Sequence, residues 1–161
     1  MSEAEHLPFD ALNAALKAAG EDTRLRVLVL LSEAELTVSD LTQILRQSQP
    51  RISRHLKLLV EAGLIERHRE GAWAFFRLAE QGGGAELARM LIARLDPKDP
   101  IIARDRDRLS AVRAARAAAA QDYFRAHAVE WDRIRKLHVP DEAVEQAIRD
   151  ALADKPFRSL L

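Results

Sequence analysis

The segment from 46 to 57 combines a local excess of positive charge with the apolar spacing of a helix. Its basic residues, with no Asp or Glu among them, are Arg46, Arg51, Arg54 and Lys57. At about 100° per residue, the last three fall away from the apolar stripe of that helix, which consists of Ile52, Leu56, Leu59 and Val60. Ser48, Gln49 and Ser53 lie beside the cations and add short hydrogen-bonding groups. This combination suits phosphate oxygens and base edges of DNA, the alternative being an ordinary solvated helix surface.

Other kinds of site find little support in the sequence. The absence of cysteine excludes disulfides, thiolate metal sites and cysteine nucleophiles. His127 and His138 are eleven residues apart, which is not a spacing that holds one metal on a single helix. We interpret His55 and His68 as packing or phosphate-contacting residues. No nucleotide-binding glycine motif occurs, because Gly82-Gly83-Gly84 follows no full strand of a βαβ unit. We therefore expect no catalytic residues, no cofactor and no tight zinc or arsenite site.

Composition is that of a globular protein whose charge is balanced. Of 161 residues, 48% are hydrophobic and 31% are charged. The 25 Lys and Arg residues equal the 25 Asp and Glu residues, so bulk charge favours neither nucleic acid nor membrane as a partner. No apolar run approaches the roughly 18 residues that span a bilayer. The acidic start, from Met1 to His6, lacks the features of a secretory signal, so a cytoplasmic location is the default expectation.

Periodicity predicts a mainly α chain with one small β-hairpin. Helices are expected over 9–19, 21–31, 38–45, 49–62 and 85–95, with hairpin strands in 64–69 and 72–78. Thr37 and Asp40 have the spacing of a capping box, and Ser48 is a good N-cap for the helix that follows. A helix pair with a tight turn, followed by a hairpin, is the winged helix-turn-helix plan. We therefore take 49–62 as a recognition helix for the major groove and 64–78 as a wing, with Arg67 and Arg69 as backbone contacts.

The second part of the chain is expected to be a helical C-terminal extension. Pro97 and Pro100 mark a boundary, which gives a DNA-binding and dimerisation domain at 1–96, a linker at 97–100 and an extension at 101–161. No Pro or Gly interrupts residues 101–139, so one long helix or two helices in line are expected, followed by a short helix over 141–153. We interpret the alternating charges of Arg104-Asp105-Arg106-Asp107-Arg108 as a solvated face.

Residues 8–96 resemble the ArsR/SmtB-type winged-helix repressors. The stretches that carry the resemblance are 16–18, 23–28, 35–41, Ser48-Gln49-Pro50-Arg51-Ile52-Ser53-Arg54-His55-Leu56-Lys57-Leu58-Leu59, Glu61-Ala62-Gly63-Leu64-Ile65 and 67–78. The resemblance implies a homodimer held by the first and fifth helices, binding to double-stranded operator DNA, and repression that a small-molecule effector relieves. The apolar stripes on those two helices are the expected dimer interface: Leu12, Leu16, Leu87, Leu91 and Leu95.

The chain departs from the metal-sensing members that it resembles. Arsenic sensors place two cysteines in the third helix, within a Glu-Leu-Cys-Val-Cys-Asp-Leu string, where this sequence has Thr37 and Ser39. Hydroxyl groups do not make a soft thiolate site. Zinc-binding relatives draw ligands from the fifth helix, but residues 85–95 contain no His. We therefore expect a regulator that does not sense metals.

Residues 119–161 carry a second resemblance, to the lead-in helices of S-adenosylmethionine-dependent methyltransferases fused to such regulators. It rests on Asp122-Tyr123-Phe124-Arg125, Trp131-Asp132-Arg133-Ile134-Arg135, Leu137-His138-Val139-Pro140 and the last seven residues. The acidic, glycine-rich cofactor loop that would follow is missing, so we expect no methyltransferase activity from a shortened or truncated relative. The leading hypothesis is a homodimeric, DNA-binding transcriptional repressor that is not an enzyme. The alternative is the regulatory part of a methyltransferase, in which 101–161 serves docking or the sensing of an effector such as an S-adenosylmethionine-related metabolite.

Overall fold

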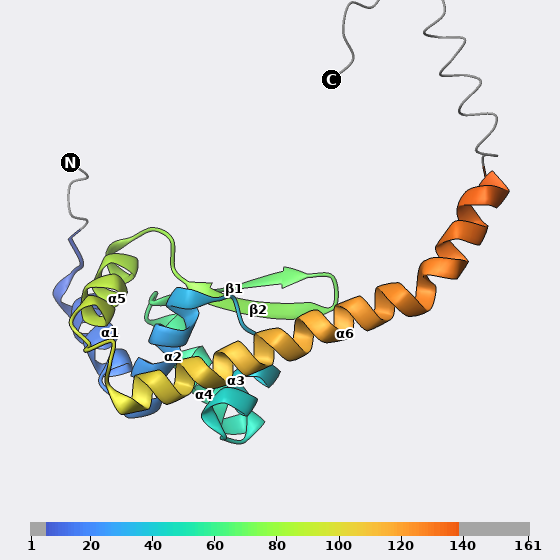
Figure 1. The fold of residues 1–161 in the computed structure, drawn as a ribbon. Coiled ribbons are helices and arrows are strands. Elements are labelled where there is room, and N and C mark those ends of the chain that lie inside the picture. The colour runs from blue at the N-terminus through green and yellow to red at the C-terminus, as the bar shows by residue number, and fades with distance from the viewer. Residues whose placement is uncertain (1–5, 139–161) are drawn as a thin grey trace, which may run out of the picture. The chain divides into compact units, whose positions relative to one another are not determined.

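A computed structural model describes residues 6–138, in which six helices accompany one two-stranded antiparallel sheet (Figure 1). The elements are α1 (Phe9–Ala19), α2 (Asp22–Glu33), α3 (Val38–Leu45), α4 (Gln49–Glu61), β1 (Ile65–Glu70), β2 (Trp73–Leu78), α5 (Gly83–Ala93) and α6 (Pro100–His138). This order confirms the predicted winged helix-turn-helix with a β-hairpin and a helical extension. The chain divides into two compact units, Met1–Ala114 and Ala115–Leu161, with α6 continuing through the boundary.

The helix-turn-helix pair begins with the predicted capping box. The Thr37 hydroxyl accepts a hydrogen bond from the Asp40 backbone N–H, and the Asp40 carboxylate accepts one from the Thr37 backbone N–H at 2.7 Å. Arg46 then adopts a left-handed conformation, with φ of 54°, and turns the chain towards α4. Ser48 occupies the N-cap position of α4 as expected, but its side chain makes no capping hydrogen bond. Its hydroxyl is exposed instead.

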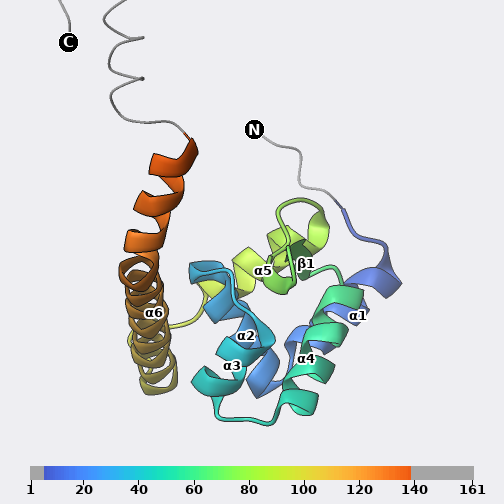
Figure 2. The same ribbon diagram turned by 90° about the vertical axis from the view of Figure 1, so that its right-hand side faces the viewer.

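The apolar faces of α1 to α5 meet the hairpin base in one core. Figure 2 shows α2, α3 and α4 grouped beside α1, and the contacts between these helices agree with that view. The largest fully buried side chains come from four of these elements and the segments next to them, and include Leu28, Leu36, Leu41, Ile52, Leu59 and Leu64. At about 1.5–3 kcal/mol for each fully buried side chain, this core supplies most of the gross stabilisation that fixes α4 on its scaffold.

Close packing also explains the glycine-rich start of α5. A Cβ atom at Gly84 would collide with the carbonyl oxygen of Gly63, which lies in the turn that ends α4. Gly63 itself has a φ of 69°, in the left-handed region that favours glycine at a helix end. Glycine at 84 therefore lets α5 approach the turn between α4 and the wing, and α5 begins at Gly83 rather than at the expected residue 85.

The wing is a regular hairpin attached to the helical body by a short bridge. Register pairs Ile65 with Leu78 at its base and Glu70 with Trp73 at its tip. Leu36, in the loop between α2 and α3, exchanges backbone hydrogen bonds of 2.9–3.0 Å with Phe76. Because side chains alternate along a strand, Arg67 and Arg69 lie on one face of β1, and His68 and Glu70 lie on the other.

The first turns of α6 correct the expectation of a solvated charge run. The Asp105 side chain is only 3% exposed and accepts two hydrogen bonds from the Arg26 guanidinium, at 2.6 and 2.7 Å. Arg106 pairs with Glu33 at 2.6 Å, and Arg108 donates to the carbonyl oxygen of Ile44 at 3.0 Å. The alternating pattern therefore fastens this part of α6 to α2 and α3, and the compact unit extends beyond the expected linker at 97–100 as far as Ala114.

In the unit that begins at Ala115, the described residues continue α6 to His138 without a break, as the lack of Pro and Gly predicts. Tyr123 and Phe124 are exposed, and the Tyr123 ring stacks on His127 with 4.1 Å between ring centroids. The expected helix at 141–153 and the last part of the methyltransferase resemblance lie outside the described residues. Within 6–138, none of the helices combines the length and apolar composition needed to span a lipid bilayer.

Candidate nucleic-acid interface

All eight residues predicted to contact DNA have exposed side chains: Ser48, Gln49, Arg51, Ser53, Arg54, Lys57, Arg67 and Arg69. The opposite face of α4 holds Ile52, Leu56 and Leu59 in the core, each no more than 1% exposed. The helix is therefore fixed by its apolar stripe, and its polar side chains are free to meet a ligand. This arrangement is what a recognition helix requires.

On one side of α4, the predicted cations line a shallow hollow. Its walls include Arg24 of α2 together with Arg51 and Arg54, while Ser48 and Leu58 complete it. Leu58 is an apolar residue on the predicted DNA-binding face, and its side chain is 38% exposed. Arg24 was not among the predicted contacts, because its position in α2 gives no sign that it lies beside the start of α4.

On the other side of α4, a groove of about 480 Å³ separates the helix from the wing. It brings together Ser53, Lys57 and Arg67, three of the predicted contacts, above an apolar floor that includes Phe76. Lys57 also approaches Glu61, with 3.7 Å between Nζ and the carboxylate, but both side chains are well exposed. Such a pair is worth only about 0.3–0.5 kcal/mol, so the ammonium group remains available to a phosphate. Arg69 lies further along β1, opposite Ala74, and does not line this groove.

The inner side of α4 carries a buried histidine rather than a phosphate contact. His55 is 9% exposed, and its Nδ1 lies 3.6 Å from a carboxylate oxygen of Glu21. Burial lowers the pKa of His55, and the positive charges of Arg24, Arg51 and Arg54 lower it further, against the opposing effect of Glu21. Burial raises the pKa of Glu21, but backbone hydrogen bonds from Arg24 and Thr23 outweigh it, so the net shift is downwards.

The predicted dimer residues separate into three environments. Leu12 and Leu16 on α1 are 37% and 45% exposed, whereas Leu91 and Leu95 on and after α5 are half-buried. Leu87 belongs to the core of the protomer itself. Figure 1 shows α1 and α5 side by side at the end of this unit away from the wing tip. The same end exposes two further apolar side chains, Phe9 and Met90.

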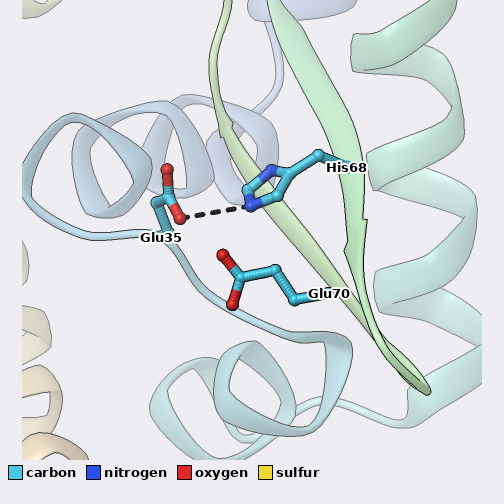
Figure 3. A group of neighbouring side chains, drawn as sticks. All are labelled: Glu35, His68 and Glu70. Atoms are coloured by element: carbon cyan, nitrogen blue, oxygen red, sulfur yellow. Dashed lines mark ion pairs between the residues drawn. The ribbon is translucent and has the colours of Figure 1, made fainter.

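A cluster that the sequence did not reveal lies on the outer face of the wing. Figure 3 shows Glu35, from the loop before α3, facing His68 and Glu70 of β1. One ligand atom from each lies within 4.8 Å of the others, and His68 Nε2 is 3.2 Å from Glu35 Oε2. Only the spacing of His68 and Glu70, two residues apart on a predicted strand, hinted at this grouping, because Glu35 is more than thirty residues away.

Comparison with known proteins places this architecture in a family. Residues 21–67 match the family model described as bacterial regulatory protein, arsR family. The chain is 50% identical over 64 residues to the arsenical resistance operon repressor of Escherichia coli (strain K12), covering 39% of this chain and 55% of that protein. It is 34% identical over 67 residues to the transcriptional repressor SdpR of Bacillus subtilis (strain 168), covering 42% of this chain and 74% of that one. The chain belongs to the ArsR family.

The ArsR family match covers α3, α4 and nearly all of α2, and ends inside β1. All six predicted DNA contacts on and before α4 lie within it, whereas Arg69 and α6 lie beyond it. The matches cover 55% and 49% of the lengths of two curated arsenic-resistance relatives, so the chain spans about half of each. The solution structure of Mb0332 from Mycobacterium bovis, described as a homodimeric winged helix-turn-helix DNA-binding domain, is similar with a TM-score of 0.49 and 27% identity. That similarity covers 56% of this chain and 82% of that one.

Proposed function

We propose that this ArsR-family chain is a sequence-specific transcriptional repressor that binds operator DNA as a homodimer in the cytoplasm. The single observation that carries the proposal is the exposed polar face of α4, presented by a helix whose other face is wholly buried. In this proposal α4 lies in the major groove, and the β1–β2 wing lies on the adjacent phosphate backbone.

The contacts divide by chemistry into two groups. Arg54 and Arg51, in the middle of the exposed face, can each form a bidentate pair with a guanine edge. Lys57 and Arg67 face each other across the groove between α4 and the wing, and are suited to phosphates of the strand that passes there. Base contacts would specify the sequence, and phosphate contacts would fix the register and make binding sensitive to salt.

Dimerisation is proposed from the apolar surface formed by α1 and α5. Phe9, Leu12, Leu16 and Met90 are 37–81% exposed, and a monomer would leave them in water. Two copies joined there would present two α4 helices to half-sites about 34 Å apart. Light scattering should therefore give twice the chain mass of 18.1 kDa at micromolar concentration. A mass of one chain would refute the dimer, and a Leu16→Glu variant should give that mass while remaining folded.

DNA binding itself is tested with double-stranded genomic fragments and the full chain. The wild-type protein should retain a subset of fragments in the presence of excess random DNA, because base contacts discriminate among sequences. An Arg54→Ala variant should lose about 1–3 kcal/mol on the selected fragment and accept changes at one base position. Arg116→Ala, on α6 and away from the proposed face, is the matched control and should bind as the wild type does. Equal retention of all fragments by the wild-type protein would refute sequence-specific binding.

A second role is proposed for residues 101–161, as a docking or effector-sensing segment like those of methyltransferase-linked regulators. The observation that favours it is the exposure of Tyr123 and Phe124, at 56% and 67%, within the stretch that resembles a methyltransferase lead-in. Titration of the protein–DNA complex with S-adenosylmethionine should then change DNA affinity, and a Tyr123→Ala/Phe124→Ala variant should not respond. An unchanged affinity in the wild-type protein would refute effector sensing by this metabolite.

A further inference from the structure

Glu35, His68 and Glu70 have the ligand types and the spacing of a metal site, and they bridge two parts of the fold. Glu35 comes from the loop between α2 and α3, whereas His68 and Glu70 come from the wing strand β1. We propose that these three side chains bind one divalent transition-metal ion, such as Zn²⁺, which ties the wing to the helical body. The expectation of no tight zinc site considered only cysteines and the fifth helix, so it did not address this cluster.

The distances suit a single ion. Zinc binds imidazole nitrogen and carboxylate oxygen at about 2.0–2.2 Å, which places the ligand atoms of a tetrahedral site roughly 3.4 Å apart. His68 Nε2 and Glu35 Oε2 are already 3.2 Å apart. The Glu70 carboxylate lies within 4.8 Å of both, and it is on an exposed, flexible side chain that rotation can bring closer. Three protein ligands leave one position for water, as in zinc sites that are not purely structural.

Neighbouring residues orient two of the ligands. The His68 ring stacks on Phe75, with 5.8 Å between centroids and 21° between planes. His68 Nδ1 is buried without a hydrogen-bond partner among the described residues, so Nε2 is the nitrogen that the ring presents to the carboxylates. Arg77 Nη1 lies 3.7 Å from Glu35 Oε1 and so holds that carboxylate by its other oxygen. Support of this kind from outside the ligand set is typical of metal sites.

Local charge also favours a cation. Glu35, Glu66 and Glu80 share the guanidinium group of Arg77, and Glu70 adds a fourth carboxylate. Four negative charges against one positive charge leave an excess of three, which a divalent ion reduces to one. An imidazole with two carboxylates suits zinc and similar first-row metals, whereas purely oxygen sites suit Mg²⁺ and Ca²⁺. Arsenite, which requires thiolates, has no ligand here.

The position of the site connects it to the proposed DNA contacts. Along β1, the ligands His68 and Glu70 alternate with Arg67 and Arg69 on the opposite face. An ion that joins β1 to the loop at Glu35 would hold the strand that presents these arginines, and it would offset carboxylates that repel phosphates. We therefore expect metal occupancy to strengthen DNA binding. This second step rests on the proposed function, whereas metal binding itself does not.

Metal binding is tested on the full, untagged chain by calorimetric titration with Zn²⁺ alone. The wild-type protein should bind one ion per chain. Because loss of an outer supporting group already costs about 10–100-fold in affinity, loss of a direct ligand in His68→Gln or Glu70→Gln should cost about 100-fold or more. His127→Gln and Glu66→Gln are the matched controls and should retain the ion. Absence of the site in the wild-type protein, or unchanged affinity in His68→Gln, would overturn the proposal.

DNA affinity is then measured with a chelator and with one equivalent of Zn²⁺. The wild-type complex should tighten with zinc, and His68→Gln should show the same affinity in both conditions. If zinc binds and DNA affinity does not change, the proposed action on the wing is wrong. If the wild-type protein binds no DNA even with chelator or zinc present, the proposed repressor function fails, while the calorimetric result still decides the metal site.

Discussion

The buried ion pair between Arg26 and Asp105 permits a quantitative test of how α6 is attached. Replacing Asp105 with alanine removes two hydrogen bonds of 2.6 and 2.7 Å and leaves the Arg26 guanidinium without its partner. Breaking a buried pair in this way costs about 3–5 kcal/mol. The Arg26 side chain is 18% exposed and keeps some access to water, so we expect the lower end, about 3 kcal/mol. For a unit of this size, that corresponds to a melting temperature lower by roughly 12 °C.

Urea unfolding of three variants separates charge from packing. Asp105→Ala should lose about 3 kcal/mol, whereas Arg106→Ala should lose at most about 1 kcal/mol because its pair with Glu33 is more exposed. The double variant Arg26→Met/Asp105→Leu should be close to the wild type in stability, since a buried pair can be replaced by apolar groups at little cost. A loss below about 1 kcal/mol in Asp105→Ala would refute the reasoning. A double variant as unstable as Asp105→Ala would show that packing, not an unpaired charge, causes the loss.

Three further outcomes follow from the site and its scaffold. Because burial lowers the pKa of His55 in the folded state, the unfolded chain takes up the proton first as pH falls, so the free energy of unfolding should decrease below about pH 6.5. A His55→Gln variant measured over the same pH range should show a shallower decrease, and an identical slope would contradict this. Gly84→Ala should destabilise the fold by about 1–3 kcal/mol in chemical denaturation, because its Cβ meets the Gly63 carbonyl, and a neutral result would contradict that collision. Removal of Lys57 or Arg69 should weaken binding to all DNA sequences alike and reduce the salt dependence by about one unit for each phosphate that is no longer neutralised; a change in base preference would instead assign them to base contacts.

Local patterns predicted the elements of this fold, and long-range pairing limited what they could say of the site. The apolar spacing from Phe9 to Ala19 and the Thr37–Asp40 capping box were readable because they depend on residues a few positions apart. The alternating charges around Asp105 look the same whether they face water or a partner, and Arg26 lies 79 residues away. Interpretation as a solvated face was therefore wrong for a physical reason: the sequence does not show which surface covers a helix.

The same limit applies to the wing and the end of α4. Glu35 meets His68 only because the Leu36–Phe76 bridge sets the loop beside the hairpin, and no sequence period encodes that bridge. Exposure of the α4 cations followed from helical geometry alone, because an apolar stripe fixes which side faces outward. The face of a single helix is thus predictable, whereas the groove between helix and wing requires the tertiary structure.

The central claim, that α4 reads DNA, is tested most directly by removing its three exposed cations together. Arg51→Ala/Arg54→Ala/Lys57→Ala should fold as the wild type does, because these side chains are exposed and lie outside the core, and circular dichroism and light scattering check this. Binding to the fragment that the wild-type protein selects is then titrated at several salt concentrations. The account predicts loss of specific binding and a smaller salt dependence. Unchanged binding by the correctly folded variant would contradict it and would identify the basic face of α4 as an ordinary solvated surface.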